Sequence, residues 1–175
     1  MSRKLFIYIA SSLDGYIAGP GDDLSFLDVV DKEGEDYGYN DFISTVDTVI
    51  LGRRTYDWVT RKVDFPHSDK ETYVITRTPR SSKGKITFFT GDLKELVTAL
   101  KKAPGKNIFC DGGAEIIHEL LKHDLIDEFV IAVIPVLLGN GIRLFKDDRP
   151  ELKLEFISFK SYDTGLVQLH YHRSR

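Results

Sequence analysis

The sequence contains a single cysteine, Cys110, and this scarcity excludes two kinds of protein. One thiol forms no disulfide within the chain, and it leaves no cysteine cage for a structural zinc ion. Cys110 ends an apolar segment, and the sequence places no base or cation beside it to lower its pKa. We therefore expect a buried structural cysteine and not a nucleophile.

Histidine is also sparse, with five residues in the chain. His118 and His123 lie five positions apart, whereas metal ligands on a helix recur three or four apart. His170 and His172 would share one face of a strand, which is a weak signal by itself. We expect no metal site.

An excess of charge of one sign is lacking, and so is a long hydrophobic run. The 24 basic and 27 acidic residues leave a formal net charge of -3, so no basic field is available for nucleic acid. The first apolar stretch is broken at Ser11 and Asp14 and is too short for a signal peptide or a membrane span. We expect a cytoplasmic protein that binds neither nucleic acid nor membrane.

Two nucleotide-binding motifs are absent. The dinucleotide fingerprint G-x-G-x-x-G is not found, because residues 111–115 (DGGAE) lie past mid-chain and lack the third glycine. The phosphate loop G-x-x-x-x-G-K-[ST] is missing too. A Rossmann domain and a P-loop hydrolase are thereby disfavoured.

The hydrophobic pattern alternates between strands and helices. The 175 residues, 42% of them hydrophobic, suffice for one domain with a core. Helices are predicted over 36–46, 54–60, 92–101 and 112–121, and strands over 4–10, 48–51, 71–76, 86–89, 107–110, 127–136, 152–160 and 166–172. Residues 19–35 form a long polar loop in this scheme, and 163–165 form a hairpin turn. The order predicts an α/β fold whose mostly parallel sheet ends in an antiparallel hairpin.

A glycine pair, Gly112-Gly113, joins a predicted strand to a predicted helix. The free N–H groups and positive dipole end of a helix's first turn can hold a phosphate. The alternative is that two glycines merely allow a sharp turn. Neither interpretation is decided by the pair alone.

Arginines mark a second junction of the same kind, at residues 52–55 (GRRT). Arg53 and Arg54 open a helix, where cations oppose the dipole and favour a nearby anion, although two surface arginines are also common there. Thr76 and Arg77 end the next strand with another cation. A cofactor with a pyrophosphate and a separate ribose phosphate would use such spaced sites.

Five short motifs occur in order along nearly the whole chain: residues 12–18 (SLDGYIA), 52–56 (GRRTY), 74–77 (VITR), 111–115 (DGGAE) and 135–139 (PVLLG). Together they resemble the dihydrofolate reductase-like superfamily, in particular the branch of the reductase domain of bifunctional riboflavin-biosynthesis proteins. The resemblance implies a three-layer fold with helices on both faces of the sheet. It also implies NADPH as hydride donor.

The resemblance assigns the cofactor contacts. Arg53, with Arg77, would bind the 2'-phosphate, Thr55 and the glycine turn the pyrophosphate, and Ile17-Ala18 would lie near the nicotinamide. Relatives often carry a cis peptide between the two glycines, so one is expected at Gly112-Gly113. The expected cofactor-binding set is Ile17, Ala18, Gly52, Arg53, Arg54, Thr55, Thr76, Arg77, Gly112, Gly113, Ala114 and Glu115.

Two carboxylates are candidates for the proton donor that reduction of an imine or carbonyl needs. Asp14 leaves the first strand beside the expected nicotinamide, and Asp36 begins a helix where the resemblance places a catalytic carboxylate. Glu35 and Asp41 compete with Asp36. Asp14 could equally stabilise its own turn, and Asp36 could be a dipole-favoured helix charge.

The substrate is less constrained than the cofactor. Riboflavin-pathway reductases tend to carry a basic residue where this chain has Tyr16, so a phosphoribosyl substrate is in doubt. We expect a reductase of a small pyrimidine-like, pterin-like or sugar-derived compound, with 5-amino-6-(5-phosphoribosylamino)uracil among the candidates. An NADPH-binding sensor without catalysis and a non-enzymatic assembly module are the alternatives. The apolar run 130–138 suggests a homodimer.

Overall fold

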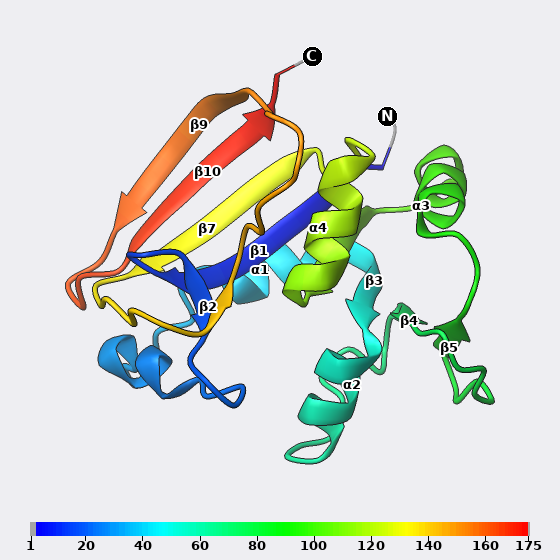
Figure 1. Cartoon of the computed structure of the whole chain (residues 1–175), viewed down its shortest axis with the longest axis horizontal. Helices are drawn as coiled ribbons and strands as arrows, with labels where there is room; N and C mark the ends of the chain where they lie inside the picture. Colours follow the sequence, from blue (N-terminus) through cyan, green and yellow to red (C-terminus); the bar gives the residue numbers. More distant parts are fainter. Residues whose placement is uncertain (1–2, 175) are drawn as a thin grey trace.

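A computed structural model describes residues 3–174 and contains an eight-stranded sheet with helices on both faces (Figure 1). The sheet order is β5-β4-β3-β6-β1-β7-β10-β9, and β2 and β8 form a separate pair. The strands are β1 (Leu5–Ser12), β2 (Tyr16–Ala18), β3 (Val46–Gly52), β4 (Glu71–Ile75), β5 (Ile86–Phe89), β6 (Asn107–Gly112), β7 (Glu128–Ile134), β8 (Ile142–Arg143), β9 (Leu154–Ser161) and β10 (Val167–Arg173). The helices are η1 (Ser25–Val30), α1 (Tyr39–Ser44), α2 (Arg53–Thr60), α3 (Leu93–Lys102) and α4 (Ala114–Lys122).

Strand direction confirms the predicted architecture. β1 pairs in parallel with β6 and β7, and β3 with β4 and β6, while β10 runs antiparallel to both β7 and β9. The hairpin turn between β9 and β10 is closed by a hydrogen bond from the Gly165 amide to the Tyr162 carbonyl (3.0 Å). The carboxyl ends of β1, β3, β4, β6 and β7 therefore share one edge of the sheet.

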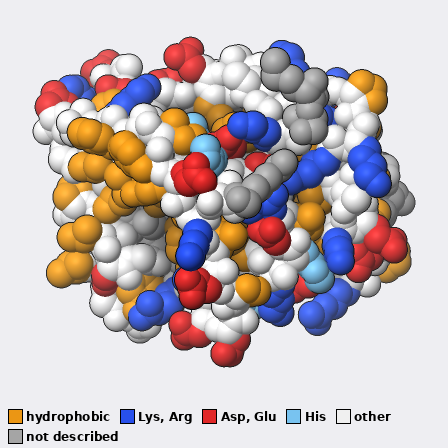
Figure 2. Space-filling model, turned by 90° about the horizontal axis from the view of Figure 1, so that it is seen from above, with side chains coloured by type: hydrophobic (Ala, Val, Ile, Leu, Met, Phe, Trp, Pro, Cys, Tyr) orange, Lys and Arg blue, Asp and Glu red, His pale blue; other side chains and the backbone are white. Residues whose placement is uncertain are grey.

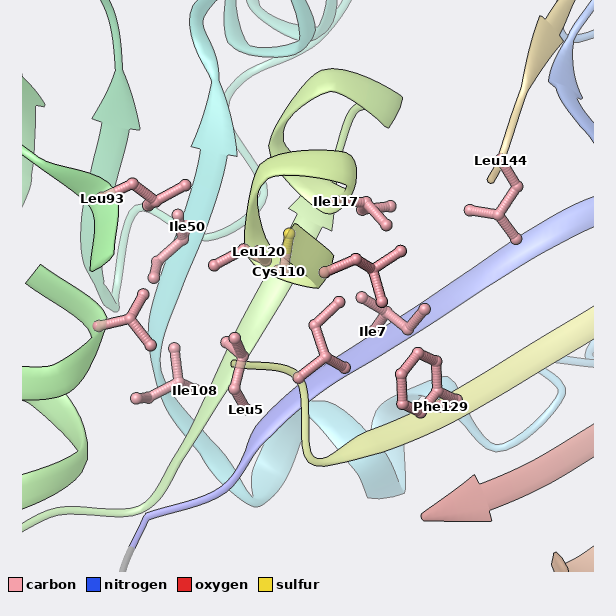
Figure 3. Close-up of a cluster of buried hydrophobic side chains, with 13 residues drawn as sticks. Leu5, Ile7, Ile50, Leu93, Ile108, Cys110, Ile117, Leu120, Phe129 and Leu144 are labelled. Carbon is pink, nitrogen blue, oxygen red and sulfur yellow. The ribbon is translucent and has the colours of Figure 1, made fainter. Parts of the chain in front are cut away.

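Helices α3 and α4 cover one face of the sheet. Val97, Ile117 and Leu120 pack with strand residues such as Leu5 in a single buried cluster. Figure 3 places Cys110 in the middle of that cluster, where burial raises the pKa of its thiol to about 12. The prediction that Cys110 is a buried residue of the core is confirmed.

Helices α1 and α2 contribute to a second cluster, which contains the opposite side chains of the same strands. Phe42 and Tyr56 pack there with Val49 and Phe109. Alternate residues of β6 thus belong to different clusters, as the two-residue period of a strand requires. Both faces of the central strands are buried.

Three local predictions were wrong. Residues 25–30 form the 3-10 helix η1, with Phe26 and Val30 buried, where a loop without periodicity was expected. Helix α1 covers only 39–44 and not 36–46, because Val46 already pairs with Asn107 in the sheet. The pair β2·β8 was not foreseen, because strands of two or three residues leave no periodic signal.

The apolar run 130–138 does not lie at an edge of the sheet. Its β7 part is an interior strand between β1 and β10, and Val130 and Ile134 are buried. β7 therefore leaves no free edge for pairing with a second copy, and the homodimer stays a prediction. The exposed edge on that side of the sheet is β9, where Phe156 and Phe159 are exposed, and Figure 2 shows hydrophobic side chains gathered on the left, the side on which β9 and β10 lie in Figure 1. Among residues 3–174, no helix is long and apolar enough to cross a membrane.

Candidate active site at the carboxyl edge of the sheet

Two glycine motifs that lie about sixty residues apart in the chain meet at the ends of β3 and β6. A Cβ atom added to Gly113 would lie 3.3 Å from Thr55 Oγ1, and one added to Gly52 would lie 3.2 Å from Ile116 Cγ1. Contacts of 3.2 to 3.3 Å leave little room for a side chain on either glycine. Both junctions therefore expose backbone at the same place.

The helices that start at these junctions have open first turns. Gly52 precedes α2 and Gly113 precedes α4, and within residues 3–174 no side chain caps either helix. Helix α3 differs, because Asp92 accepts a hydrogen bond from the Glu95 amide (2.8 Å). The free N–H groups of two adjacent uncapped helix N-termini are suited to phosphate groups.

The peptide bond between Gly112 and Gly113 is cis, as the resemblance implied. Gly112 has φ +90°, a conformation that side chains other than glycine rarely adopt. Ala114 is buried at the start of α4, and Glu115 is exposed in its first turn. A hydrogen bond from Lys146 (2.5 Å) lowers the pKa of Glu115, so this carboxylate already has a cationic partner.

Three arginines surround the open helix ends. Arg53 and Arg54 are exposed in the first turn of α2, and Arg77 is exposed just after β4. Arg54 lies 3.8 Å from Asp22 of the loop after β2, a distant and solvent-accessible pair. The Thr76 hydroxyl is buried and bonded to the backbone of Thr78, so Thr76 stabilises the turn that carries Arg77.

Asp14 links two loops. Its carboxylate accepts hydrogen bonds from the Ser12 hydroxyl (2.5 Å) and from the amides of Leu138 (3.0 Å) and Gly139 (2.7 Å). These bonds lower the pKa of Asp14 to about 2, and the bond from Ser12 has the largest effect. Asp14 therefore joins two of the five motifs, residues 12–18 and 135–139. A carboxylate that is ionised at neutral pH has no proton to supply.

Asp36 occupies a comparable position before α1. Its two oxygens accept the amides of Gly38 (2.9 Å) and Asn40 (3.0 Å), and these bonds lower its pKa. The carboxylate is exposed and lines a cavity of about 370 Å³. Asp36 is therefore a charged acceptor at the wall of the cavity.

The cavity lies beside the glycine junctions, against β1, β7 and β10. Aliphatic side chains form much of its wall, while Gln168 and three tyrosines add polar groups. The lining residues are Tyr8, Ile9, Ala10, Leu27, Asp28, Val30, Asp31, Asp36, Tyr37, Tyr39, Ala132, Ile134, Leu166 and Gln168. Its volume is in the range typical of small-molecule sites.

The three tyrosine hydroxyls have different partners. Tyr8 donates to the Tyr37 carbonyl (2.7 Å), and Tyr37 donates to the Val30 carbonyl. The Tyr39 hydroxyl instead lies 3.4 Å from Nε2 of buried His67, and that nitrogen lies 3.7 Å from a carboxylate oxygen of Asp111. Burial raises the pKa of Tyr39, so its hydroxyl keeps its proton at neutral pH.

Nothing in the sequence singles out His67, because the residues around it are neither periodic nor part of a motif. The residue lies in the segment between α2 and β4, and it is 3% exposed against Phe65 and Phe109. The contact between His67 and Tyr39 is a product of the tertiary fold.

Ile17 and Ala18 were expected beside the nicotinamide, and both belong to the short strand β2. Ile17 packs against the main core, and Ala18 is 5% exposed. The backbone at Gly141 approaches Ala18 so closely that an added Cβ would lie 2.1 Å from the Ala18 carbonyl oxygen. The two residues thus hold the loop after β7 against the loop after β1.

A second cavity, of about 440 Å³, opens at the opposite edge of the sheet, near the starts of β3 and β4. Arg3, in its wall, is buried and hydrogen-bonded to Asp47, Thr48 and backbone carbonyls. The charged and polar groups around Arg3 therefore already have hydrogen-bond partners within the protein. This cavity is remote from the glycine junctions, and we assign it a structural role.

Comparison with known proteins identifies the family, since the model of the RibD C-terminal domain matches residues 3–168. The chain belongs to the RibD C-terminal domain family. Members of this reductase family typically use NAD(P)H. The uncharacterized protein YwjB of Bacillus subtilis is 46% identical over 176 residues, which cover 99% of this chain and all of YwjB.

Solved structures of this RibD-like chain's relatives agree on the fold. A protein of Shewanella sp. PV-4, provisionally assigned to riboflavin biosynthesis, superposes with a TM-score of 0.89 at 32% identity, with both chains fully covered. Dihydrofolate reductase from Enterococcus faecalis, complexed with NADP(H), gives 0.70 at 17% identity, again over the whole of both chains. The second likeness concerns the fold alone.

Proposed function

We propose that the protein is an NADPH-dependent reductase of a small heterocyclic or sugar-derived compound. The observation that supports this most is the meeting of residues 52–55 and 112–115 beside a cavity of about 370 Å³. Residues 52–55 and 112–115 have the backbone and the cations that the phosphates of a dinucleotide need. The cavity has the volume for a second, smaller ligand.

The residues present fit this cofactor. The backbone at Gly52 and Gly113 and the open turns of α2 and α4 would hold the pyrophosphate. Exposed Arg53 and Arg77 would bind the 2'-phosphate, because guanidinium groups bind phosphate bidentately. When bound, NADPH supplies a hydride from C4 of its nicotinamide.

Tyr39 would supply the proton that accompanies the hydride. The hydroxyls of Tyr8 and Tyr37 donate hydrogen bonds to backbone carbonyls. The Tyr39 hydroxyl lies instead beside an imidazole, a group that can return a proton to it. The Tyr39 O–H bond would break as the substrate nitrogen or oxygen takes the proton. Nε2–H of a protonated His67 would then give its proton to the phenolate, and the neutral imidazole would regain a proton from water between turnovers. The Asp111 carboxylate would stabilise the charged imidazole.

The predicted carboxylates receive other roles in this proposal. Asp36 would accept a hydrogen bond from a substrate N–H at the cavity wall. Asp14 would keep the loops after β1 and β7 in register beside the nicotinamide. Neither would donate the proton, since hydrogen bonds lower the pKa of both.

The test is NADPH oxidation, followed by absorbance, across a panel of pyrimidines, pterins and lactols. Consumption of NADPH with one substrate class, and release of a product reduced by two electrons, is the expected result. Saturable NADPH binding without turnover on any compound would favour a cofactor sensor. No NADPH binding would contradict the proposal.

A further inference from the structure

The cavity beside the glycine junctions has charged residues of one sign only. Asp28, Asp31 and Asp36 line it, and no lysine, arginine or histidine is among its lining residues within 3–174. All three carboxylates are solvent-exposed side chains at its mouth. A phosphate group would enter against this negative field.

The three carboxylates form no ion pair with a nearby cation. Lys32 is paired with Asp163 (2.5 Å), and none of the ion pairs between residues 3 and 174 involves Asp28, Asp31 or Asp36. Lys160, whose Nζ would lie 3.9 Å from a Cβ atom added to Gly38, forms none of these pairs either. The hydrogen bonds from Gly38 and Asn40 also keep Asp36 ionised at neutral pH. The mouth is therefore acidic in the folded protein.

Neutral polar groups in the wall offer mainly acceptors. The Gln168 amide nitrogen donates to Tyr8 Oη (2.8 Å) and to the Tyr37 carbonyl (3.2 Å), so both of its protons are used. The Gln168 amide oxygen takes part in none of the hydrogen bonds formed among the described residues. With the carboxylates, it would accept N–H donors from a ligand.

We infer that the cavity selects an uncharged or cationic amino-substituted ring without a phosphate ester. This inference rests on the proposed function and narrows its substrate class. A phosphate monoester carries between one and two negative charges at neutral pH and is usually bound by arginine or lysine. Within the same molecule, such cations surround the cofactor junctions and are missing from the cavity lining.

The test is a matched pair of ligands, 5-amino-6-ribosylaminouracil and its 5'-phosphate, titrated calorimetrically into protein saturated with NADP⁺. We expect the unphosphorylated compound to bind at least about tenfold more tightly at low salt. The double variant Asp28→Asn with Asp31→Asn should reduce this preference severalfold. Asp41→Asn, which removes an exposed carboxylate of α1 outside the cavity lining, should leave it unchanged.

Equal or tighter binding of the phosphate ester would overturn the inference, and so would a preference that the double variant leaves intact. Binding of neither compound would overturn it as well. Titration of NADP⁺ alone reports on the proposed function separately. Saturation with NADP⁺ combined with tighter binding of the phosphate ester would reject the substrate class and leave the reductase proposal standing.

Discussion

The two halves of the sheet's carboxyl edge differ in charge. Around the ends of β3, β4 and β6, exposed Arg53, Arg54 and Arg77 stand beside open helix N-termini. Around β1, β7 and β10, the charged residues lining the cavity are Asp28, Asp31 and Asp36. In the proposed function, the first half would hold a polyanionic dinucleotide and the second half a ring that donates N–H groups.

Such a difference would separate two neighbouring ligands by charge alone. A cofactor with several phosphates would be repelled from the acidic cavity and attracted to the arginines, so that each ligand would have one favourable site. The Asp14 carboxylate, which bonds Leu138 and Gly139, joins the loops between the two sites. Substitutions or salt that weaken only one of the two sites therefore test whether they act separately.

Tyr39→Phe should produce the largest effect, on the cavity side. Loss of a general acid lowers the rate by about 10² to 10⁴-fold, so we expect kcat to fall by at least about 10²-fold while NADPH binding is unchanged. Steady-state kinetics measure this. Tyr8→Phe is the matched control, because the wild-type Tyr8 hydroxyl already donates its hydrogen bond to the Tyr37 carbonyl. A Tyr39→Phe enzyme with nearly full kcat would remove Tyr39 as the proton source.

Arg53→Ala should act on the cofactor side alone. Hydrogen bonds to charged groups are worth about 1.5 to 3 kcal/mol, which corresponds to about a 10 to 100-fold loss of NADPH affinity. NADH affinity should not change, and isothermal titration compares the two. Arg61→Ala, at the far end of α2, is the control. Equal losses for NADPH and NADH would show that Arg53 does not contact the 2'-phosphate.

Salt should affect the two sites unequally. Exposed arginine–phosphate pairs are screened as ionic strength rises, so NADPH affinity should fall between low and high salt. The affinity of an uncharged substrate should change little, because its contacts are hydrogen bonds and apolar packing. Fluorescence titration of both ligands over a salt series makes the comparison. Parallel slopes for the two ligands would contradict the division by charge.

A smaller effect is expected from Asp14→Asn in acid. The folded pKa of Asp14 is about 2, below the ordinary value of 3.8, so its hydrogen bonds stabilise the fold above pH 4 and are lost as the pH falls toward 2. Thermal unfolding between pH 5 and pH 2 should therefore show a smaller loss of Tm for Asp14→Asn than for the wild type. Asp41→Asn should follow the wild type. Identical curves for all three proteins would mean that the loop link contributes nothing.

Much of this fold could be predicted, because strongly periodic segments and punctuating glycines dominate the sequence. The helix over 92–101 and the Gly112-Gly113 junction with its cis peptide bond were both anticipated. The missed features depend on long-range contacts. Val46 joined the sheet although its spacing continued a helix, and η1 gained order by burying Phe26.

The candidate site was predictable where glycine and arginine act through the backbone or through fixed charge. It was not predictable where a side chain's role depends on its partners. The sequence could not reveal that Asp14 is tied to Leu138 and Gly139, or that His67 lies against Tyr39. These are contacts between segments that the fold alone brings together.

The most direct test of the account is calorimetric titration of the wild-type protein with NADPH and with NADH at one low salt concentration. The two cofactors differ by one phosphate, the group assigned to Arg53 and Arg77. We predict that NADPH binds at least about tenfold more tightly, which corresponds to about 1.4 kcal/mol. Equal affinities, or no binding of either, would contradict the claim that the cationic half of this edge is an NADPH site.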